Sequence, residues 1–247
     1  MANPVLSSSR FADATAAPGE GTMTLSGTIV KTGLLMGFCA LTAVGVVVTA
    51  TNPPSDGTQG LVFVAAIAGL IVGLVGSFVP RWAAITAPLY AILEGVVLGG
   101  TAVIFNTIKG YAGLPVTALV LTLLIGFIML ALYATRLVHV TQRFRAVITS
   151  AILGIMAYYV VAFIAGLFGT HLPLMYDSGW LSIGFSVFVV CVASASFLLD
   201  FDAIERASQH GAPHYFEWYG AFGILVTFIW LYFEILRLLA KVAGRRR

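Results

Sequence analysis

Four acidic side chains lie in or beside long apolar runs, where an ionisable group is rare: Glu94, Asp200, Asp202 and Glu234. A charged side chain at the centre of a membrane helix costs about 2.5–3.5 kcal/mol, so acids found there commonly serve a proton or ion pathway. Carboxylate oxygens are also the ligands that Ca²⁺ prefers. These four residues are therefore the candidates for proton sensing or cation conduction.

Glu94 lies in the run Leu89-Tyr-Ala-Ile-Leu-Glu-Gly-Val-Val-Leu-Gly-Gly100, with no Lys or Arg within four residues. Its partner must therefore come from another helix. Two interpretations stay open. Glu94 either binds a proton or lines an ion pathway, as a transient Ca²⁺ ligand, or it makes a structural hydrogen bond to a neighbouring backbone.

Asp200 and Asp202 point about 200° apart on a helix, so they cannot act as a pair with each other. Arg206 follows Asp202 at i+4, a spacing that favours an ion pair. Asp200 has apolar neighbours, and a low-dielectric environment favours the protonated form of a carboxyl group. We therefore predict that Asp200 senses protons or binds Ca²⁺ transiently; a solvated aspartate at the membrane interface is the alternative.

Glu234 precedes Arg237 by three residues, a spacing at which the two charges can neutralise each other within one helix. The alternative is a place on the ion pathway. The remaining reactive side chains show no metal-binding or redox spacing. They are His139, His171, His210, His214, Cys39 and Cys191. No phosphate loop, GxSxG, HExxH or GxGD motif is present, so we expect no cofactor and no enzyme activity.

The composition shows what kind of element must position these acids. Of the 247 residues, 60% are hydrophobic and 9% are charged, against about 25% charged in an average soluble domain. A soluble chain of this length could not bury so much apolar surface. A soluble enzyme, a disordered chain and a nucleic-acid-binding domain are excluded, and the lipid bilayer is the expected partner.

Seven apolar runs are long enough to cross about 30 Å of hydrocarbon. They are residues 28–49, 60–79, 85–108, 116–133, 146–168, 180–204 and 216–240. The connections are short, which predicts an all-α, seven-helix membrane bundle over residues 28–241. Residues 1–27 form a predicted disordered polar leader, and residues 242–247 form a basic tail.

The basic residues predict the orientation of the bundle, because Lys and Arg gather on the cytoplasmic side. With the leader inside, that side collects Arg10, Lys31, Arg81, Arg136, Arg143, Arg145 and Arg206. The outer loops between helices then hold only Lys109. We expect a cytoplasmic N-terminus. Seven spans place the basic tail outside, and a re-entrant last segment is the alternative.

Three segments together resemble the transmembrane Bax inhibitor motif family, in its bacterial branch. They are residues 88–99, residues 197–205 with the polar hairpin that follows, and residues 217–239. The resemblance implies a bacterial inner membrane, a central last helix and a pH-sensitive calcium leak. In this family, an aspartate late in the sixth helix shares a proton with an aspartate in the last helix, and an arginine latches onto the pair.

When the two aspartates of the family are placed on this sequence by position, Asp200 matches the first, and Thr227 occupies the position expected for the second. A threonine cannot ionise, so the shared proton is lost. If the turn of the hairpin centres near Gly211, the two helices face each other with Asp200 level with about Phe222 to Thr227, independently of the resemblance. Glu234 then lies about 10 Å beyond Thr227, which makes it a poor direct partner for Asp200. Arg81 corresponds by location to the latch arginine, and Glu94 matches a carboxylate found in part of the family.

The leading hypothesis is a cation leak, for Ca²⁺ above all, modulated by protonation around Asp200. Asp200, Thr227 and Arg81 form the predicted gate, and Glu94, Asp200 and Glu234 line the predicted ion pathway. The alternatives are a regulator that binds a membrane protease or another membrane protein through its leader, and a proton-coupled transporter of a small solute.

Overall fold

The structure is a computed structural model that describes residues 21–50, 56–170 and 179–245. These ranges contain α2 (Leu25–Thr49), α3 (Asp56–Phe78), the short 3-10 helix η1 (Pro80–Trp82), α4 (Ala83–Thr107), α5 (Leu114–Ala134), α6 (Gln142–Leu167), α8 (Trp180–Gln209) and α9 (Phe216–Arg245). Most of the predicted leader, His171 and the last two arginines lie outside the described residues.

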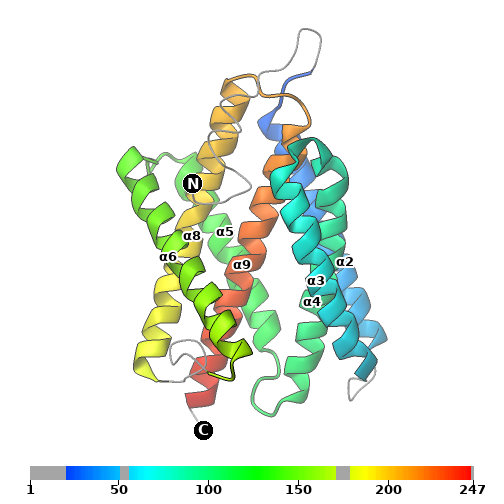
Figure 1. Ribbon diagram of the computed structural model, residues 1–247. Helices are drawn as coiled ribbons and strands as arrows, with labels where there is room; N and C mark the ends of the chain where they lie inside the picture. Colours follow the sequence, from blue (N-terminus) through cyan, green and yellow to red (C-terminus); the bar gives the residue numbers. More distant parts are fainter. Residues whose placement is uncertain (1–20, 51–55, 171–178, 246–247) are drawn as a thin grey trace.

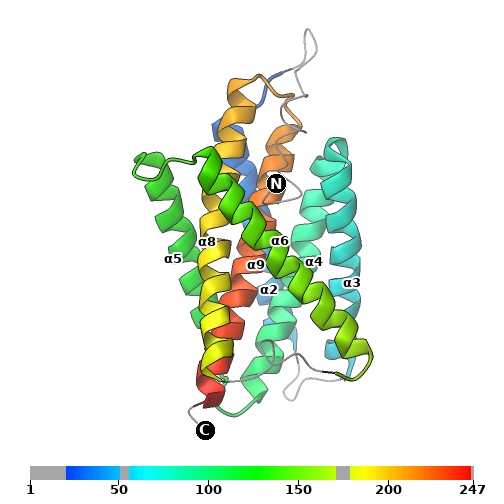
Figure 2. The same cartoon turned by 60° about the vertical axis from the view of Figure 1, so that its left-hand side comes forward.

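Seven of these helices are long and apolar enough to cross a membrane, which confirms the predicted class. They run alternately up and down, and α9 passes through the middle in both views (Figures 1 and 2). Helix α9 contacts α2, α4, α5 and α8, whereas α6 packs mainly on α8 at the periphery. The last helix is therefore central, and it is an unbroken helix of 30 residues rather than a re-entrant segment.

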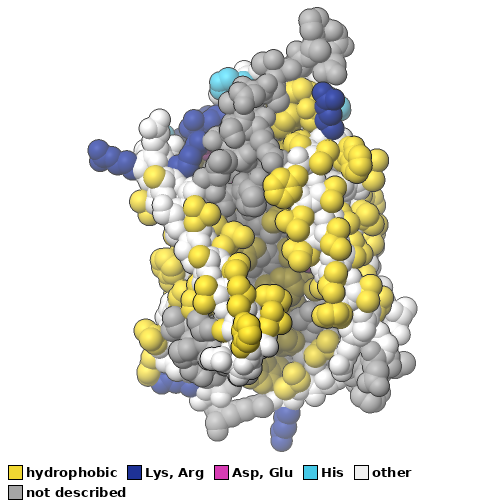
Figure 3. Space-filling model, in the orientation of Figure 1, with side chains coloured by type: hydrophobic (Ala, Val, Ile, Leu, Met, Phe, Trp, Pro, Cys, Tyr) yellow, Lys and Arg dark blue, Asp and Glu magenta, His cyan; other side chains and the backbone are white. Residues whose placement is uncertain are grey.

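Large apolar side chains cover the outside of the bundle (Figure 3). Ile29 on α2, Phe63 on α3, Phe127 on α5 and Phe163 on α6 are each about two-thirds exposed, at 66–69%. The side chains of Lys and Arg gather instead towards the two ends (Figure 3). Such a surface is more apolar than that of a soluble protein and suits solvation by lipid. Lipid solvation explains how a chain with few charges can fold.

Several element boundaries differ from those expected from hydropathy. Helix α8 continues to Gln209, so the polar connection to α9 is shorter than predicted. Helix α2 begins at Leu25, inside the predicted leader, and α9 extends into the predicted basic tail. The Thr24 side chain caps α2 by accepting a hydrogen bond from the Gly27 amide at 3.0 Å. Hydropathy indicates only the apolar part of a helix. These helices are longer than predicted because polar turns extend them beyond their apolar parts.

The residues before α2 pack onto the connection between α8 and α9. The Met23 amide donates a hydrogen bond to the Ala212 carbonyl at 2.7 Å, and the His214 amide donates one to the Gly21 carbonyl at 2.9 Å. The start of α2 is thereby fixed to the end of the bundle at which α9 begins.

A close approach between α2 and α4 depends on two glycines spaced as in a G-x-x-x-G motif. A Cβ atom on Gly95 would lie 2.5 Å from the Cys39 carbonyl oxygen, and one on Gly99 would lie 2.5 Å from the Ala43 carbonyl oxygen. Both obstacles are backbone atoms, so neither can move without shifting a helix. The glycines therefore set the distance between α2 and α4, the helix that carries Glu94.

We expect Gly95→Ala to lower the free energy of unfolding by about 1–3 kcal/mol, the range for overpacking a tight contact. Thermal unfolding of the purified protein in detergent measures the change. Gly37→Ala on α2 is the matched control, because a Cβ there meets nothing within 4 Å. The free energy of unfolding of this control should stay the same or rise by up to about 1 kcal/mol, because Ala has a higher helix propensity than Gly. Equal melting temperatures for the two variants would contradict the prediction.

Candidate functional site

The centre of the bundle contains the predicted contact between Asp200 and Thr227. Helix α8 carries Asp200 and α9 carries Thr227, and the Thr227 hydroxyl donates a hydrogen bond to Asp200 Oδ2 at 2.5 Å. Their exposed fractions are 1% and 3%. The placement of Thr227 beside Asp200 is confirmed, whereas their role as a gate stays a prediction. This buried contact between α8 and α9 therefore contains one carboxyl group, whereas the family resemblance implies two.

Glu94 lies on α4 in a second polar spot, between α2 and α3. The prediction that its partner comes from another helix is wrong, because its carboxylate is hydrogen-bonded to Tyr90 one turn earlier on α4. Cys39 on α2 also interacts electrostatically with it. A Cβ on Gly69 of α3 would lie 3.2 Å from Glu94 Oε1, so the carboxylate rests against the α3 backbone. Both interpretations of Glu94 remain compatible with this position.

The depths of Glu94 and Thr227 can be compared through an aromatic contact. The rings of Tyr90 on α4 and Phe222 on α9 meet edge to face at 5.1 Å. The two helices run in the same direction (Figure 1). From that contact, Glu94 lies about 6 Å and Thr227 about 7.5 Å further along, at 1.5 Å per residue. Glu94 and the Asp200–Thr227 contact therefore share one level of the bundle.

Glu234 forms the predicted ion pair with Arg237, whose Nη1 atom lies 2.9 Å from Glu234 Oε2. The Tyr159 hydroxyl of α6 and the Trp230 indole also donate to Glu234 Oε1, at 2.8 and 3.1 Å. The Glu234 side chain is 1% exposed. It lies about 10 Å from Thr227 along α9, so Glu234 and Asp200 are separate sites, as the hairpin geometry predicted.

Asp202 is also paired as predicted, with a second partner that the sequence did not indicate. The Arg206 guanidinium donates to Asp202 Oδ1 at 3.1 Å. Arg145, at the start of α6, forms a further ion pair with Asp202. A neighbouring cluster joins Tyr133 and Arg136 to Glu205. These contacts fasten the ends of α5 and α6 to α8.

Arg81 lies in η1 with an exposed side chain. No ion pair joins it to a carboxylate of the described residues. The structure therefore does not bring Arg81 onto Asp200, and the latch stays a prediction. Within the described ranges, no three His, Cys, Asp or Glu side chains gather as a metal ion would require. The transient Ca²⁺ role of Asp200 and Glu94 likewise stays a prediction.

One buried acid was missed as a site residue. Glu217 opens α9 with a side chain that is 1% exposed, and it pairs with Lys31 of α2. The Thr24 amide and hydroxyl donate to Glu217 Oε1 at 2.9 and 2.8 Å. An acid in the first turn of a helix and a lysine inside an apolar run were both visible in the sequence. Only the packing of α2 on α9 joins them.

The described residues thus define a class of protein: a seven-helix membrane bundle with acidic groups at several depths around a central last helix. The sequence matches the family described as Bax inhibitor 1 like over residues 3–244, nearly the whole chain. The chain belongs to this family. No curated protein and no solved structure matches it.

Proposed function

We propose that the protein is a cation leak, conducting Ca²⁺ along α9, with conduction modulated by the proton on Asp200. The observation that carries the proposal is the contact between Asp200 and Thr227, a carboxyl group buried at the central helix with a neutral hydroxyl donor. Protonation of such a group changes its charge in a low-dielectric environment, where the electrostatic effect is large.

The distribution of carboxylates around α9 supports a pathway for cations. Glu94 offers oxygen ligands at the level of Asp200, and Glu234 offers them about 10 Å further along. Weak, successive oxygen sites allow a cation to enter and also to leave, as conduction requires. The Arg237 partner of Glu234 would keep the ligand strength of that site low.

We further infer that the end of the bundle at which α9 begins faces the cytoplasm of a bacterial cell. Lys31, Arg81, Arg136, Arg145 and Arg206 lie at that end. The other end holds Lys109, Lys241 and Arg245 among the described residues. Basic residues beside the spans favour the cytoplasmic side. A partner-binding regulator and a proton-coupled transporter remain the alternative predictions.

The test is Ca²⁺ flux into liposomes that contain the purified protein, measured between about pH 5 and pH 8, the range in which a perturbed group can switch. Asn has the shape of a protonated aspartate and cannot ionise. We therefore expect Asp200→Asn to hold the flux at its wild-type low-pH value across the whole range.

Asp202→Asn is the matched control, since it removes an acid two residues away on another face of α8. Its flux should keep the pH dependence of the wild type. A wild-type pH profile in Asp200→Asn would remove Asp200 from the gate. Absence of Ca²⁺ flux from the wild type at every pH would overturn the proposed function itself.

A further inference from the structure

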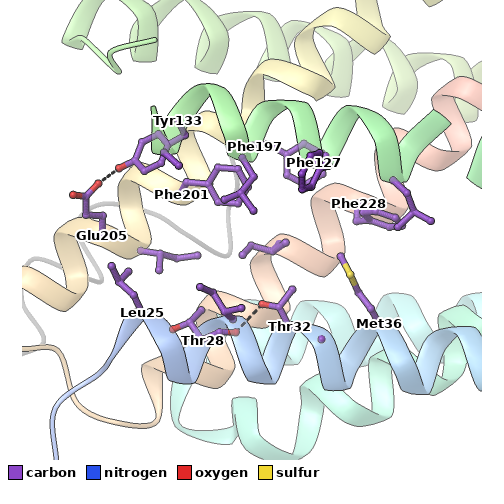
Figure 4. A pocket seen from close by; sticks show the side chains of 18 of the residues that line it. Leu25, Thr28, Thr32, Met36, Phe127, Tyr133, Phe197, Phe201, Glu205 and Phe228 are labelled. Atoms are coloured by element: carbon purple, nitrogen blue, oxygen red, sulfur yellow. Dashed lines mark hydrogen bonds between the residues drawn. The ribbon is translucent and has the colours of Figure 1, made fainter. Parts of the chain in front are cut away.

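A lateral groove with a volume of about 570 Å³ lies between α2 and α5, with α8 and α9 as its floor. Figure 4 shows side chains from α2 and from α5 facing each other across it. Aromatic rings form much of the α5 wall and the floor: Phe127, Phe197, Phe201 and Phe228. The rims carry Ile29 and Phe127, which are 68% and 69% exposed. On a surface solvated by lipid, such a groove is open to the bilayer.

The threonine hydroxyls within the groove already have partners in their own helix. The Thr28 hydroxyl donates to the Thr24 carbonyl at 3.0 Å, and the Thr32 hydroxyl donates to the Thr28 carbonyl at 2.8 Å. The lining therefore presents methyl groups, aliphatic chains and rings. It suits a hydrocarbon better than a polar solute or the polar leader of this chain.

The length of the groove matches one leaflet of a bilayer. On α2 the lining extends from Leu25 to Met36, and on α5 from Leu123 to Ala134. Eleven residues at 1.5 Å each give about 16 Å on both walls. Half of a hydrocarbon core of about 30 Å is about 15 Å. The groove therefore extends from one membrane interface to about the midplane.

The interfacial end of the groove carries a charged group on an unusual backbone. Arg136 follows the end of α5 by two residues and has a φ of 58°, in the left-handed region. The Leu137 amide donates to the Leu132 carbonyl at 3.2 Å, and the Arg136 amide donates to the Tyr133 carbonyl at 3.0 Å. Glycine is the usual residue in this helix-ending motif. An arginine there, despite the conformational cost, indicates a use for its side chain.

The Arg136 guanidinium extends towards solvent at the mouth of the groove, with 66% of the side chain exposed. One of its nitrogens donates to Glu205 Oε1 at 2.7 Å. The Tyr133 hydroxyl donates to the other carboxylate oxygen, Glu205 Oε2. Glu205 is thereby neutralised and hydrogen-bonded on both oxygens, while the guanidinium has five N–H donors in total. Its geometry suits a phosphate oxygen.

The whole end of the bundle around this mouth is basic. Among the described residues it holds six Lys and Arg side chains: Lys31, Arg81, Arg136, Arg143, Arg145 and Arg206. The carboxylates there are Asp202, Glu205 and Glu217. The difference, six minus three, is a net charge of +3 with neutral histidines. This charge favours a lipid with an anionic headgroup over a zwitterionic one.

We propose that the groove between α2 and α5 binds one acyl chain of an anionic phospholipid, whose phosphate contacts Arg136. The apolar lining, the leaflet length and the basic mouth select this occupant over a second copy of the chain. The site does not depend on the proposed cation leak, and its test measures lipid rather than ion flux.

The test uses two glycines that line opposite walls of the groove, Gly33 on α2 and Gly126 on α5. A Cβ on Gly33 meets nothing within 4 Å, and a Cβ on Gly126 meets Phe197 and Phe228 at 4.0 Å. Gly33→Leu and Gly126→Leu should therefore fill the groove without a backbone clash. Gly45→Leu is the matched control, on α2 in open space outside the groove.

Native mass spectrometry of the full chain counts bound phosphatidylglycerol or phosphatidylcholine with identical acyl chains. We expect each groove variant to lose one bound phosphatidylglycerol per chain, while Gly45→Leu keeps it. Arg136→Gln should lower the preference for phosphatidylglycerol about fivefold, the factor for about 1 kcal/mol per basic residue near anionic lipid. Unfolding temperatures verify that each variant is folded. If one of the two groove variants does not fold, the other alone is sufficient to test the proposal.

Equal phosphatidylglycerol binding by wild type, Gly33→Leu and Gly126→Leu would overturn the proposal. Equal binding of the two lipids by the wild type would overturn the role of the headgroup. A dimer that dissociates in the groove variants would instead assign the groove to a second copy. Tighter lipid binding after deletion of residues 1–20 would assign it to the leader.

Discussion

Thr227→Asp is expected to move the pH dependence of Ca²⁺ flux to higher pH than in the wild type. The Thr227 hydroxyl now donates to Asp200 at 2.5 Å, so an aspartate there would place two carboxyl groups at hydrogen-bond distance. Two like charges this close cannot both ionise comfortably, and the pair titrates as a unit that shares a proton. The shared proton should therefore be lost at a pH about one unit or more above that at which the wild type loses the proton of Asp200, and the change in flux should move with it.

The same substitution should make stability depend on pH. Repulsion between the two carboxylates exists only when both are ionised, so the variant should become less stable as the pH rises. An uncompensated buried charge costs about 3–5 kcal/mol, which is a large fraction of a typical folding free energy. Thermal unfolding of the purified variant in detergent at about pH 6 and pH 8 measures the difference, in a range where protonation commonly switches.

Two variants separate the carboxylate pair from a mere change of shape. Asparagine has nearly the same volume as aspartate and cannot ionise, so the flux of Thr227→Asn should keep the pH profile of the wild type. Adding Asp200→Asn to Thr227→Asp restores a single acid and should reverse most of the shift. If the pH profile of Thr227→Asn shifts as far as that of Thr227→Asp, the effect is steric and the pair is not the cause.

The predictable part of this site lies within one hairpin. Asp200 lies 9 residues before the end of α8, and Thr227 lies 11 residues after the start of α9. The short connection between the two helices therefore places them at similar depths whatever the other helices do. Pairs at i+3 and i+4, such as Glu234 with Arg237, follow from helix geometry alone. The seven spans are similarly local, because length and apolar composition determine whether a segment can cross a bilayer.

The contacts that sequence reasoning missed join helices that are distant in the chain. Arg145 reaches Asp202 because α6 packs on α8, and Tyr159 reaches Glu234 for the same reason. Lys31 meets Glu217 because α2 begins beside the start of α9. Lipid-exposed faces are as apolar as buried ones, so the hydrophobic pattern does not indicate which face of a membrane helix meets a neighbour.

Arg237→Met is expected to lower the free energy of unfolding by about 3 kcal/mol, because removal of one partner leaves a buried charge uncompensated. Glu234 is 1% exposed, and Arg237 is the cation that pairs with it in the described part of the chain. Tyr159 and Trp230 would still donate hydrogen bonds to the carboxylate, but neither can neutralise it. Thermal unfolding in detergent measures the change, and Met keeps much of the apolar volume.

Arg206→Met is the matched control on another buried acid. Arg206 is 52% exposed, and Asp202 keeps its second partner, Arg145. The control should therefore cost less than about 1 kcal/mol, as expected of an exposed ion pair. Adding Glu234→Gln to Arg237→Met removes the orphaned charge and should recover most of the loss. If the double variant is no more stable than Arg237→Met, the arginine contributes through packing on Tyr159, whose ring lies 4.9 Å from the guanidinium, rather than through its charge.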